Sequence, residues 1–349
     1  LEIELQEAST EADLAQLIDL LQAEWALEAE PRSKFERGLI FVGAKPTLEP
    51  PQAPALVLDP DDAIAEAARQ ALAFHYERMA ANEAGTRAGE DIEALHDMRV
   101  ATRRMRAAGS IFERYLDEAA LAIYIESLRA TGRALGPVRD LDVFWKKAQA
   151  YVEREDTAPD LGPLATAWET ARQHARAEML AYLDSEAYAD FKRQFEALLD
   201  APLPIRDRLS YKGTARPYYL RPIIPVVLYR RLARVRAFDE WVTHPSPELT
   251  HCHRLRIAIK RLRYALEFFE APLAPHSHTL IEKLKAVQDH LGDLQDAVVA
   301  RRRLRAFLAA GVLSARSDRP TNDDAPAAID APEVAAYLAH QQAEIQRLL

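Results

Sequence analysis

The sequence has one cysteine, few glycines and no long apolar run, and each shortage excludes a class of protein. Cys252 alone cannot form an intramolecular disulfide, which fits a reducing compartment. The 11 glycines include no Gly-x-x-x-x-Gly-Lys phosphate loop. No apolar run approaches the roughly 20 residues that span a bilayer, and no signal peptide opens the chain. We therefore expect a soluble cytoplasmic protein that has no membrane partner.

The overall composition is that of an acidic globular protein. With 349 residues, 49% of them hydrophobic, the chain is long enough for one large or two ordinary domains, each with its own core. Its formal net charge is −9 and its pI is about 5.7, so any basic cluster is a local feature. Nonspecific duplex DNA binders are more often basic over a whole face, which counts against that class.

One basic helical phrase occurs twice, at 96–108 and at 253–265. At about 100° per residue, each copy places an apolar stripe on one side of the helix and a basic stripe nearly opposite it. The apolar stripes consist of Met98, Ala101, Met105, Ala108 and Phe112 in the first copy, and of Leu255, Ala258, Leu262, Ala265 and Phe269 in the second. The basic stripes consist of His96, Arg99, Arg103 and Arg106, and of His253, Arg256, Lys260 and Arg263.

A basic stripe opposite an apolar one is usually a solvated helix face, but the charge pattern favours a binding face here. Solvated faces normally mix acids with bases at i,i+4 spacing. The second copy contains no acid between His253 and Arg263, and the first contains only Asp97. Like charges on adjacent turns repel, so a repeating anion or nearby carboxylates must offset them.

The rest of the chain divides into unequal parts. Alternating residues at 1–5, an amphipathic stretch and a short apolar strand predict a strand-helix-strand segment over 1–45, and five prolines make 46–60 an extended linker. From residue 61 onward the periodicity is almost wholly helical, with a polar loop at 314–330. We expect an all-α fold over 61–348, in which 61–200 and 221–348 form two similar halves. The predicted helices lie near 61–84, 90–115, 117–135, 139–156, 160–184, 187–200, 221–242, 247–271, 276–291, 294–310 and 333–348.

A second motif is also duplicated, at a similar distance after each basic helix. Leu135-Gly136-Pro137 matches Leu291-Gly292-Asp293, and each is followed by an aspartate, Asp140 or Asp296. We expect Gly136 and Gly292 to end helices, where a positive φ costs little only for glycine. Asp140 and Asp296 would either cap the next helix or hold an arginine of the basic face.

Taken together, the two basic helices and the two Leu-Gly-x-[Val/Leu]-x-Asp turns resemble the CHAD family, the conserved-histidine α-helical domain, over roughly residues 61–348. The first segment resembles the end of a CYTH domain, a triphosphate tunnel fold that is commonly fused ahead of CHAD domains. Its matching positions are Glu2, Glu4, Lys34 and Arg37. So few strands cannot close the tunnel, so we expect this chain to lack triphosphatase activity. If the chain is a piece of a longer protein, that longer protein is a candidate triphosphatase.

The CHAD resemblance implies two four-helix up-and-down bundles, related by a pseudo-twofold axis, around a basic central groove or pore that binds inorganic polyphosphate. It implies a binding or targeting module and not an enzyme, with localisation to polyphosphate bodies and with polyphosphate-metabolising enzymes as further partners. The ligand-facing residues carried over are the eight of the two basic stripes. Arg104 and Arg261 lie at the edge of the basic face, and Arg129, Arg133, Lys283 and Lys285 on the following helices complete the candidate site.

Elementary chemistry agrees with a polyphosphate ligand. Guanidinium groups bind phosphate oxygens in bidentate fashion, and helical turns repeat every ~5.4 Å, so a basic stripe can engage several consecutive phosphates. A nearby polyanion should raise the pKa of His96 and His253, so mild acid should tighten binding.

Other functions have weaker support in the sequence. RNA or single-stranded nucleic acid fits the same stripes, but Tyr264 is the only aromatic residue within the two motifs, whereas such sites stack several bases. A scaffold for an acidic protein partner is the third possibility. His96-Asp97 lacks the further His and Asp ligands of metal-dependent phosphohydrolases, and adjacent residues such as His251 and Cys252 point about 100° apart on a helix. We therefore expect no catalytic residue, no metal and no cofactor.

Overall fold

The computed structural model describes residues 55–155, 159–206, 210–211, 214–215, 219–244, 247–313 and 329–349. By its internal contacts the chain divides into two compact units, Leu1–Ala55 and Leu56–Leu349. The predicted strand-helix-strand segment, residues 46–54 of the predicted linker and residues 314–328 of the polar loop lie outside the described residues.

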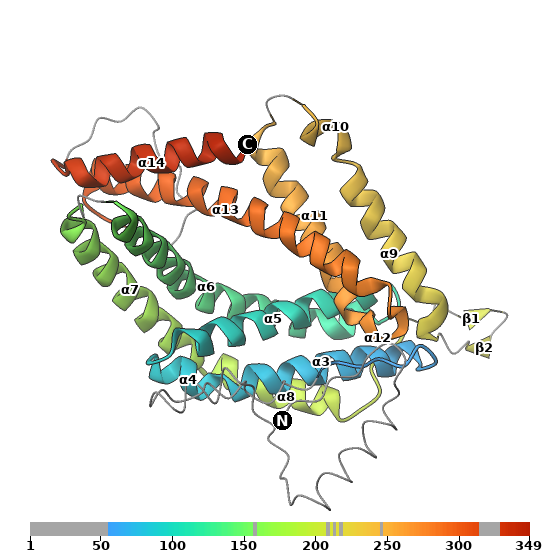
Figure 1. Cartoon of the computed structure of the whole chain (residues 1–349). Coiled ribbons are helices and arrows are strands. Elements are labelled where there is room, and N and C mark those ends of the chain that lie inside the picture. Colours follow the sequence, from blue (N-terminus) through green and yellow to red (C-terminus); the bar gives the residue numbers. More distant parts are fainter. Residues whose placement is uncertain are drawn as a thin grey trace, which may run out of the picture. The chain divides into compact units, whose positions relative to one another are not determined.

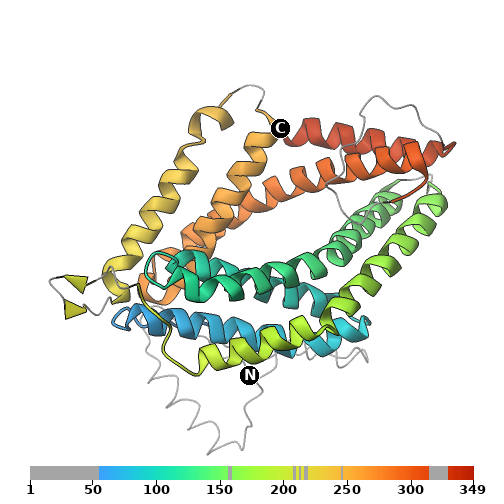
Figure 2. The ribbon, with the colours of Figure 1, turned by 180° about the vertical axis from the view of Figure 1, so that it is seen from behind.

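Within Leu56–Leu349 the described residues are almost wholly helical, which confirms the all-α fold class (Figures 1 and 2). The first group of helices runs α3 (Ile64–Ala81), α4 (Glu83–Ala88), α5 (Ile92–Phe112), α6 (Glu118–Arg154), α7 (Gly162–Leu183) and α8 (Glu186–Leu199). A two-residue hairpin of β1 (Ser210–Tyr211) and β2 (Thr214–Ala215) follows. The second group runs α9 (Leu220–Arg236), α10 (Asp239–Val242), α11 (Leu249–Phe268), α12 (Glu270–Leu273), α13 (Ser277–Ala310) and α14 (Pro332–Leu348).

Helices that follow one another pack together in each group. In the first, α3 packs on α5, α5 on α6, and α6 on α7; in the second, α9 packs on α11, α11 on α13, and α13 on α14. Both views show α13 and α14 side by side (Figures 1 and 2). Helices α5 and α11, which carry the two basic phrases, also contact each other. Whether the groups are two bundles related by a pseudo-twofold axis stays a prediction.

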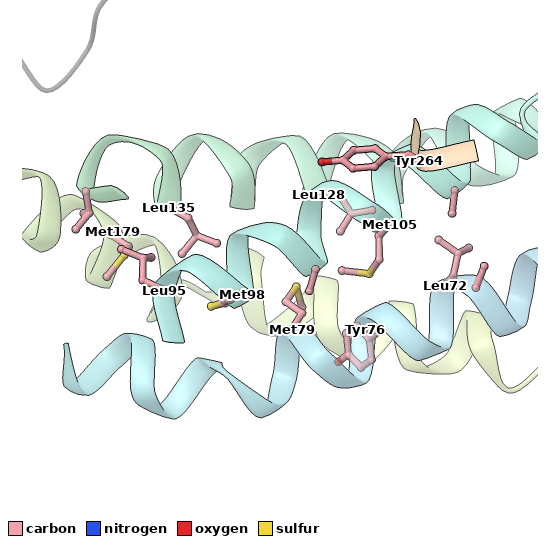
Figure 3. Close-up of a cluster of buried hydrophobic side chains, with 14 of the residues drawn as sticks. Leu72, Tyr76, Met79, Leu95, Met98, Met105, Leu128, Leu135, Met179 and Tyr264 are labelled. Atoms are coloured by element: carbon pink, nitrogen blue, oxygen red, sulfur yellow. The ribbon is translucent and has the colours of Figure 1, made fainter. Parts of the chain in front are cut away.

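The apolar stripes form the core, as the helical period predicts. All five apolar residues of α5 are at most 3% exposed. They meet Leu72 and Met79 of α3 and Leu128 of α6 in the cluster drawn in Figure 3. In the second copy Leu255, Leu262, Ala265 and Phe269 are buried. Ala258 is only half-buried, because it lines an open hollow beside α9.

The prediction that Gly136 and Gly292 end helices is wrong. Predicted helices 117–135 and 139–156 are one helix, α6, and 276–291 and 294–310 are one helix, α13. The apolar face continues in register through the glycines, with Leu135, Val138 and Leu141 at most 1% exposed. This continuous burial outweighs the cost of about 3 kcal/mol for Pro137, which lacks an N–H donor inside α6.

The glycines that take a positive φ are Gly89 (φ 72°) and Gly311 (φ 71°), which cap the C-termini of α4 and α13. Helix α4 was not distinguished from the helix before it. Predicted helices 61–84, 221–242 and 247–271 each break near their C-terminal end into a long helix and a short one. Helices α5 and α6 have side-chain N-caps: Asp91 accepts from the Glu93 amide, and Asp117 from the amides of Ala119 and Ala120.

Among the helices of the described ranges, none combines the length and apolar character that crossing a bilayer requires.

Candidate functional site

The two basic stripes meet where α5 and α11 come together, and Lys260 lies at the meeting point. Burial and the charges of Arg103, Arg256, Arg99 and Arg106 lower the pKa of Lys260 to about 8. Three of these arginines come from α5 and one from α11. The residues predicted from two copies 157 positions apart, such as Arg103 and Lys260, therefore form one cationic cluster.

Arg103 is the most enclosed cation that α5 contributes to this cluster. Burial, and next to it the charges of Arg99, Arg104 and Arg263, lower the pKa of its guanidinium despite an opposite effect from Tyr264. Its Nε atom is buried and has no hydrogen-bond partner among the described residues. The group lies 5.6 Å from the ring centroid of Tyr264 on α11, a cation–π contact between the two helices.

Tyr264 and Glu267 of α11 hold the arginines that flank Arg103. The guanidinium carbons of Arg104 and Arg263 lie 5.3 and 5.1 Å from the Tyr264 ring centroid. The Glu267 carboxylate forms an ion pair with Arg104 at 2.8 Å and another with Arg263. Arg263 also donates from Nε to Oε1 of Gln288 at 2.9 Å. Arg104 and Arg263 thus share one carboxylate, whereas Arg103 and Lys260 are not paired with a carboxylate within the described ranges.

Corresponding arginines of the two copies lie over corresponding glycines. A Cβ atom on Gly136 would lie 3.9 Å from Nη2 of Arg99, and one on Gly292 would lie 3.9 Å from Nε of Arg256. Arg99 is held by Asp140 at 2.6 Å, as one of the two sequence hypotheses proposed. Asp296 instead pairs with Lys147 at 2.8 Å. Neither aspartate caps a helix, because α6 and α13 continue through these positions.

The two predicted histidines have different surroundings. His96 is half-buried, and burial followed by the charge of Arg139 lowers its pKa. His253 is exposed, and its Nδ1 atom lies 2.7 Å from Oε1 of Gln295. His96 is therefore mainly neutral near pH 7 and gains its charge only below that pH.

Helix α6 extends the cationic cluster past Arg106. Burial and the charges of Arg129 and Arg133 lower the pKa of Arg106. Glu126 pairs with Arg129 at 3.2 Å and with Arg133 at 2.8 Å, on the exposed surface of α6. These two predicted residues therefore lie near Arg106, and both pair with the same carboxylate.

Three predicted residues lie apart from the cluster. Lys283 and Lys285 are exposed on α13, and within the described ranges neither forms a hydrogen bond or an ion pair with a residue of the basic stripes. Arg261 faces α9, where it lines a separate hollow with Arg231 and Arg234. Arg261 follows Lys260 by 100° on the helix, which is enough to move it to another face.

Sequence reasoning missed several residues that organise the site. Glu267 follows Arg263 at i,i+4 spacing, a signal that was available. Arg303 gave no such signal, because a run of arginines on a helix is typical of a surface. It is only 4% exposed, and its Nη1 donates to the Asp140 carbonyl at 2.7 Å, fixing α13 against α6. Lys147 of α6 contacts Asp293 and Asp296 of α13 at 3.0 and 2.8 Å.

The described residues include no group of three or more His, Cys, Asp or Glu side chains placed to hold a metal ion. Cys252 is buried, and burial raises the pKa of its thiol. This thiol is therefore a poor nucleophile.

Comparisons with known proteins agree on one family. A family-wide sequence profile described as the CHAD domain matches residues 70–305. Two uncharacterized proteins of Mycobacterium tuberculosis, from strains CDC 1551 and H37Rv, are each 27% identical to this chain over 217 residues. The match covers 61% of this chain and 40% of each relative, so the chain spans less than half the length of the curated relatives it matches.

Two solved structures have a similar fold. The crystal structure of the CHAD domain from the plant Ricinus communis has a TM-score of 0.60 and 25% sequence identity, covering 85% of this chain and 92% of that chain. PptA from Streptomyces chartreusis has a TM-score of 0.57 and 18% identity, covering 82% and 96%. The second likeness concerns the fold alone.

Proposed function

The chain belongs to the CHAD domain family, and from this premise we propose that its helical unit is a non-enzymatic module that binds inorganic polyphosphate. The observation that carries the proposal is the convergence of Lys260 with four arginines from two helices. So many cations lie close together that they destabilise the free protein unless an anion lies between them. Of the five, only Arg99 has a carboxylate partner in the described part of the chain.

A linear polymer of phosphates suits this cluster better than a single small anion. The cations follow the helix turns, so they repeat every ~5.4 Å along α5 and α11. The polymer does not need to align in one fixed register with these cations, because every phosphate offers the same nonbridging oxygens. Long chains should therefore bind more tightly than short ones, and low-dielectric walls on both sides should strengthen each contact.

The surroundings of Tyr264 argue against single-stranded RNA. An RNA site of this kind needs exposed aromatic faces on which bases stack. Tyr264 is 3% exposed, and Arg103, Arg104 and Arg263 all lie within cation–π distance of its ring. Its faces are thus occupied by the protein's own guanidinium groups.

The proposed role is attachment of the protein to polyphosphate bodies, where it would meet polyphosphate-metabolising enzymes.

Calorimetric titration with long-chain polyphosphate tests the proposal, with tripolyphosphate and polyuridylate RNA as comparators at near-physiological salt. We expect tight, salt-sensitive binding of long-chain polyphosphate and at least tenfold weaker binding of both comparators. Arg103→Glu and Lys260→Glu should each weaken binding by at least tenfold. Because both residues contact the same ligand, the double variant should lose less than the sum of the two free-energy changes.

A charge-matched control separates the site from net charge. Arg193→Glu on α8 makes the same charge change at an exposed residue that pairs only with Asp190, so it should leave binding within about twofold. Lys283→Glu and Lys285→Glu should behave like this control. Equal affinity for RNA and polyphosphate, or equal loss in Arg193→Glu and Lys260→Glu, would contradict the proposal.

A further inference from the structure

A basic hollow lies between α9 and α11, away from the central cluster. It is open to solvent and holds about 780 Å³ of empty space, including that at its mouth. Its lining has two kinds of side chain: apolar ones, led by Phe238 and Ile257, and four arginines, Arg231, Arg234, Arg254 and Arg261. Figures 1 and 2 show α9 at the edge of the second helical group, with α11 as its neighbour.

The hollow is separate from the polyphosphate site proposed above. Arg254 and Arg261 lie about 100–120° around α11 from Lys260, on the side that faces α9. None of the residues that line the hollow belongs to the cluster of Arg99, Arg103, Arg106, Arg256 and Lys260.

The arginines of the hollow are not neutralised by carboxylates. Within the described ranges none of the four forms an ion pair with an Asp or Glu side chain. Arg231 is fixed in place, because it donates to the carbonyls of Val227 at 3.3 Å and Ser110 at 3.1 Å. Burial, then the charge of Arg234, lowers the pKa of Arg231 to about 10, against an opposite effect of Glu113. A bound anion would relieve this cost.

The apolar residues of the hollow indicate that its ligand has an apolar or planar part as well as an anionic one. An inorganic anion would leave Phe238 and Ile257 uncovered, whereas a planar or apolar body would cover them. Guanidinium groups also stack on planar rings, so the arginines can contact both parts of one ligand. The cavity volume of the hollow without the open solvent at its mouth is about 380 Å³, which falls within the range of about 300–1,000 Å³ typical of pockets for small organic molecules.

We propose that the hollow between α9 and α11 is a binding site for a nucleoside triphosphate, with the phosphates held by the four arginines and the base and sugar against Phe238 and Ile257. A triphosphate carries up to four negative charges, which matches four guanidinium groups. Affinity should therefore fall from triphosphate to diphosphate to monophosphate. The hollow offers no carboxamide or carboxylate to read the edge of a base, so purines and pyrimidines should bind with similar affinity.

Calorimetric titration with ATP, adenosine and tripolyphosphate tests this site in the full chain. The two smaller molecules are the separate halves of ATP, and we expect each to bind at least tenfold more weakly than ATP. Arg234→Glu and Arg254→Glu, both at exposed residues, should each reduce ATP affinity at least tenfold. Arg236→Glu makes the same charge change on α9 outside the hollow, at a residue paired with Asp239, and should change it by no more than about twofold.

The same variants separate this site from the polyphosphate site. Arg234→Glu and Arg254→Glu should leave long-chain polyphosphate affinity within twofold of the Arg236→Glu control, and Lys260→Glu should leave ATP affinity unchanged. The proposal is overturned if ATP does not bind, if tripolyphosphate binds as tightly as ATP, or if ATP binding is lost in Lys260→Glu and kept in Arg234→Glu. None of these results depends on whether polyphosphate binds.

Discussion

At the scale of single residues, Lys260 is the side chain whose charge responds most directly to the surrounding cations. Its pKa is lowered from 10.5 to about 8, so the amine loses protons slightly above neutral pH. An unfolded chain keeps the ordinary, higher value and binds more protons between these two pH values. Lys260 therefore destabilises the fold below pH 8, and this cost disappears as the pH rises from about 8 to 10.5.

Binding of polyphosphate should reverse the effect on Lys260. A polyanion favours the charged amine, so its pKa rises in the complex and protons are taken up near pH 8.5. We expect affinity to fall from pH 7.5 to pH 9.5 at constant ionic strength. Titrations in two buffers of different ionisation enthalpy measure the proton uptake directly.

Lys260→Gln should remove most of this pH dependence while keeping the hydrophilic side chain. Lys283→Gln, at an exposed residue outside the cluster, is the matched control and should behave as the wild type does. Unchanged proton uptake in Lys260→Gln would show that another group titrates. In the free protein the lowered pKa of His96 separates its titration from that of Lys260.

At the scale of helices, Glu267 joins the two basic elements. It is the carboxylate that contacts both Arg104 of α5 and Arg263 of α11, and its side chain is only 13% exposed. Removing its charge leaves two half-buried guanidinium groups without a counter-ion. The contact between α5 and α11 therefore depends on this one side chain for its charge balance.

We expect Glu267→Gln to lower the free energy of unfolding by about 1–3 kcal/mol, the usual cost of losing hydrogen bonds to a charged group. Saturating polyphosphate should shrink this loss, because the ligand replaces the missing negative charge. Chemical denaturation with and without the ligand measures both quantities. Glu344→Gln, which unpairs the exposed Arg347 of α14 outside the cluster, is the control and should change neither.

The helical period predicted the elements and the core of this fold. A helix that is buried on one face has apolar residues every three or four positions, and this spacing is visible in the sequence. Met98, Met105, Leu255 and Leu262 are buried as their spacing required. The stops of the helices were harder to place. Gly136 lies inside α6 and does not end a helix. The helix continues because residues on both sides of Gly136 are buried, and this tertiary packing cannot be deduced from the local sequence.

The sequence predicts which residues lie on one face of a single helix. It does not predict which faces of two different helices come together. The stripes lie on α5 and α11, the two helices that the period predicted, and their meeting at Lys260 follows from tertiary packing alone. Their role in binding stays a prediction. Arg261 was predicted to lie at the edge of the basic face, but it faces α9. Burial of Arg303 at 4% exposure was not predictable, since nothing in the run of arginines distinguishes it.

At the scale of the whole molecule, the cationic cluster lies in a chain whose net charge is −9. Long-range attraction of a polyanion is therefore weak, and the local cluster must supply the affinity. Salt should act on the free protein and on the complex in opposite directions. Screening relieves repulsion among the cations of the free protein, whereas it weakens their attraction for the ligand.

We expect the melting temperature of the free protein to rise as sodium chloride increases from about 50 to 300 mM. The increase in melting temperature caused by long-chain polyphosphate should shrink over the same range. At a ligand concentration of 100 times Kd the stabilisation should be about 2.7 kcal/mol. Calorimetric melting measures both trends, and a free protein that melts lower at higher salt would contradict the role given to the cluster.

The crowding of Arg103, Arg256 and Lys260 also determines what would happen if the protein were evolved in the laboratory for heat resistance alone. Substitutions that remove one of these cations, such as Lys260→Met, would relieve repulsion and be enriched early. The variants that such a selection favours would be stable proteins that no longer bind polyphosphate. Sequences recovered from a heat selection, compared with sequences recovered from a selection for binding, would therefore identify the functional cations by their loss.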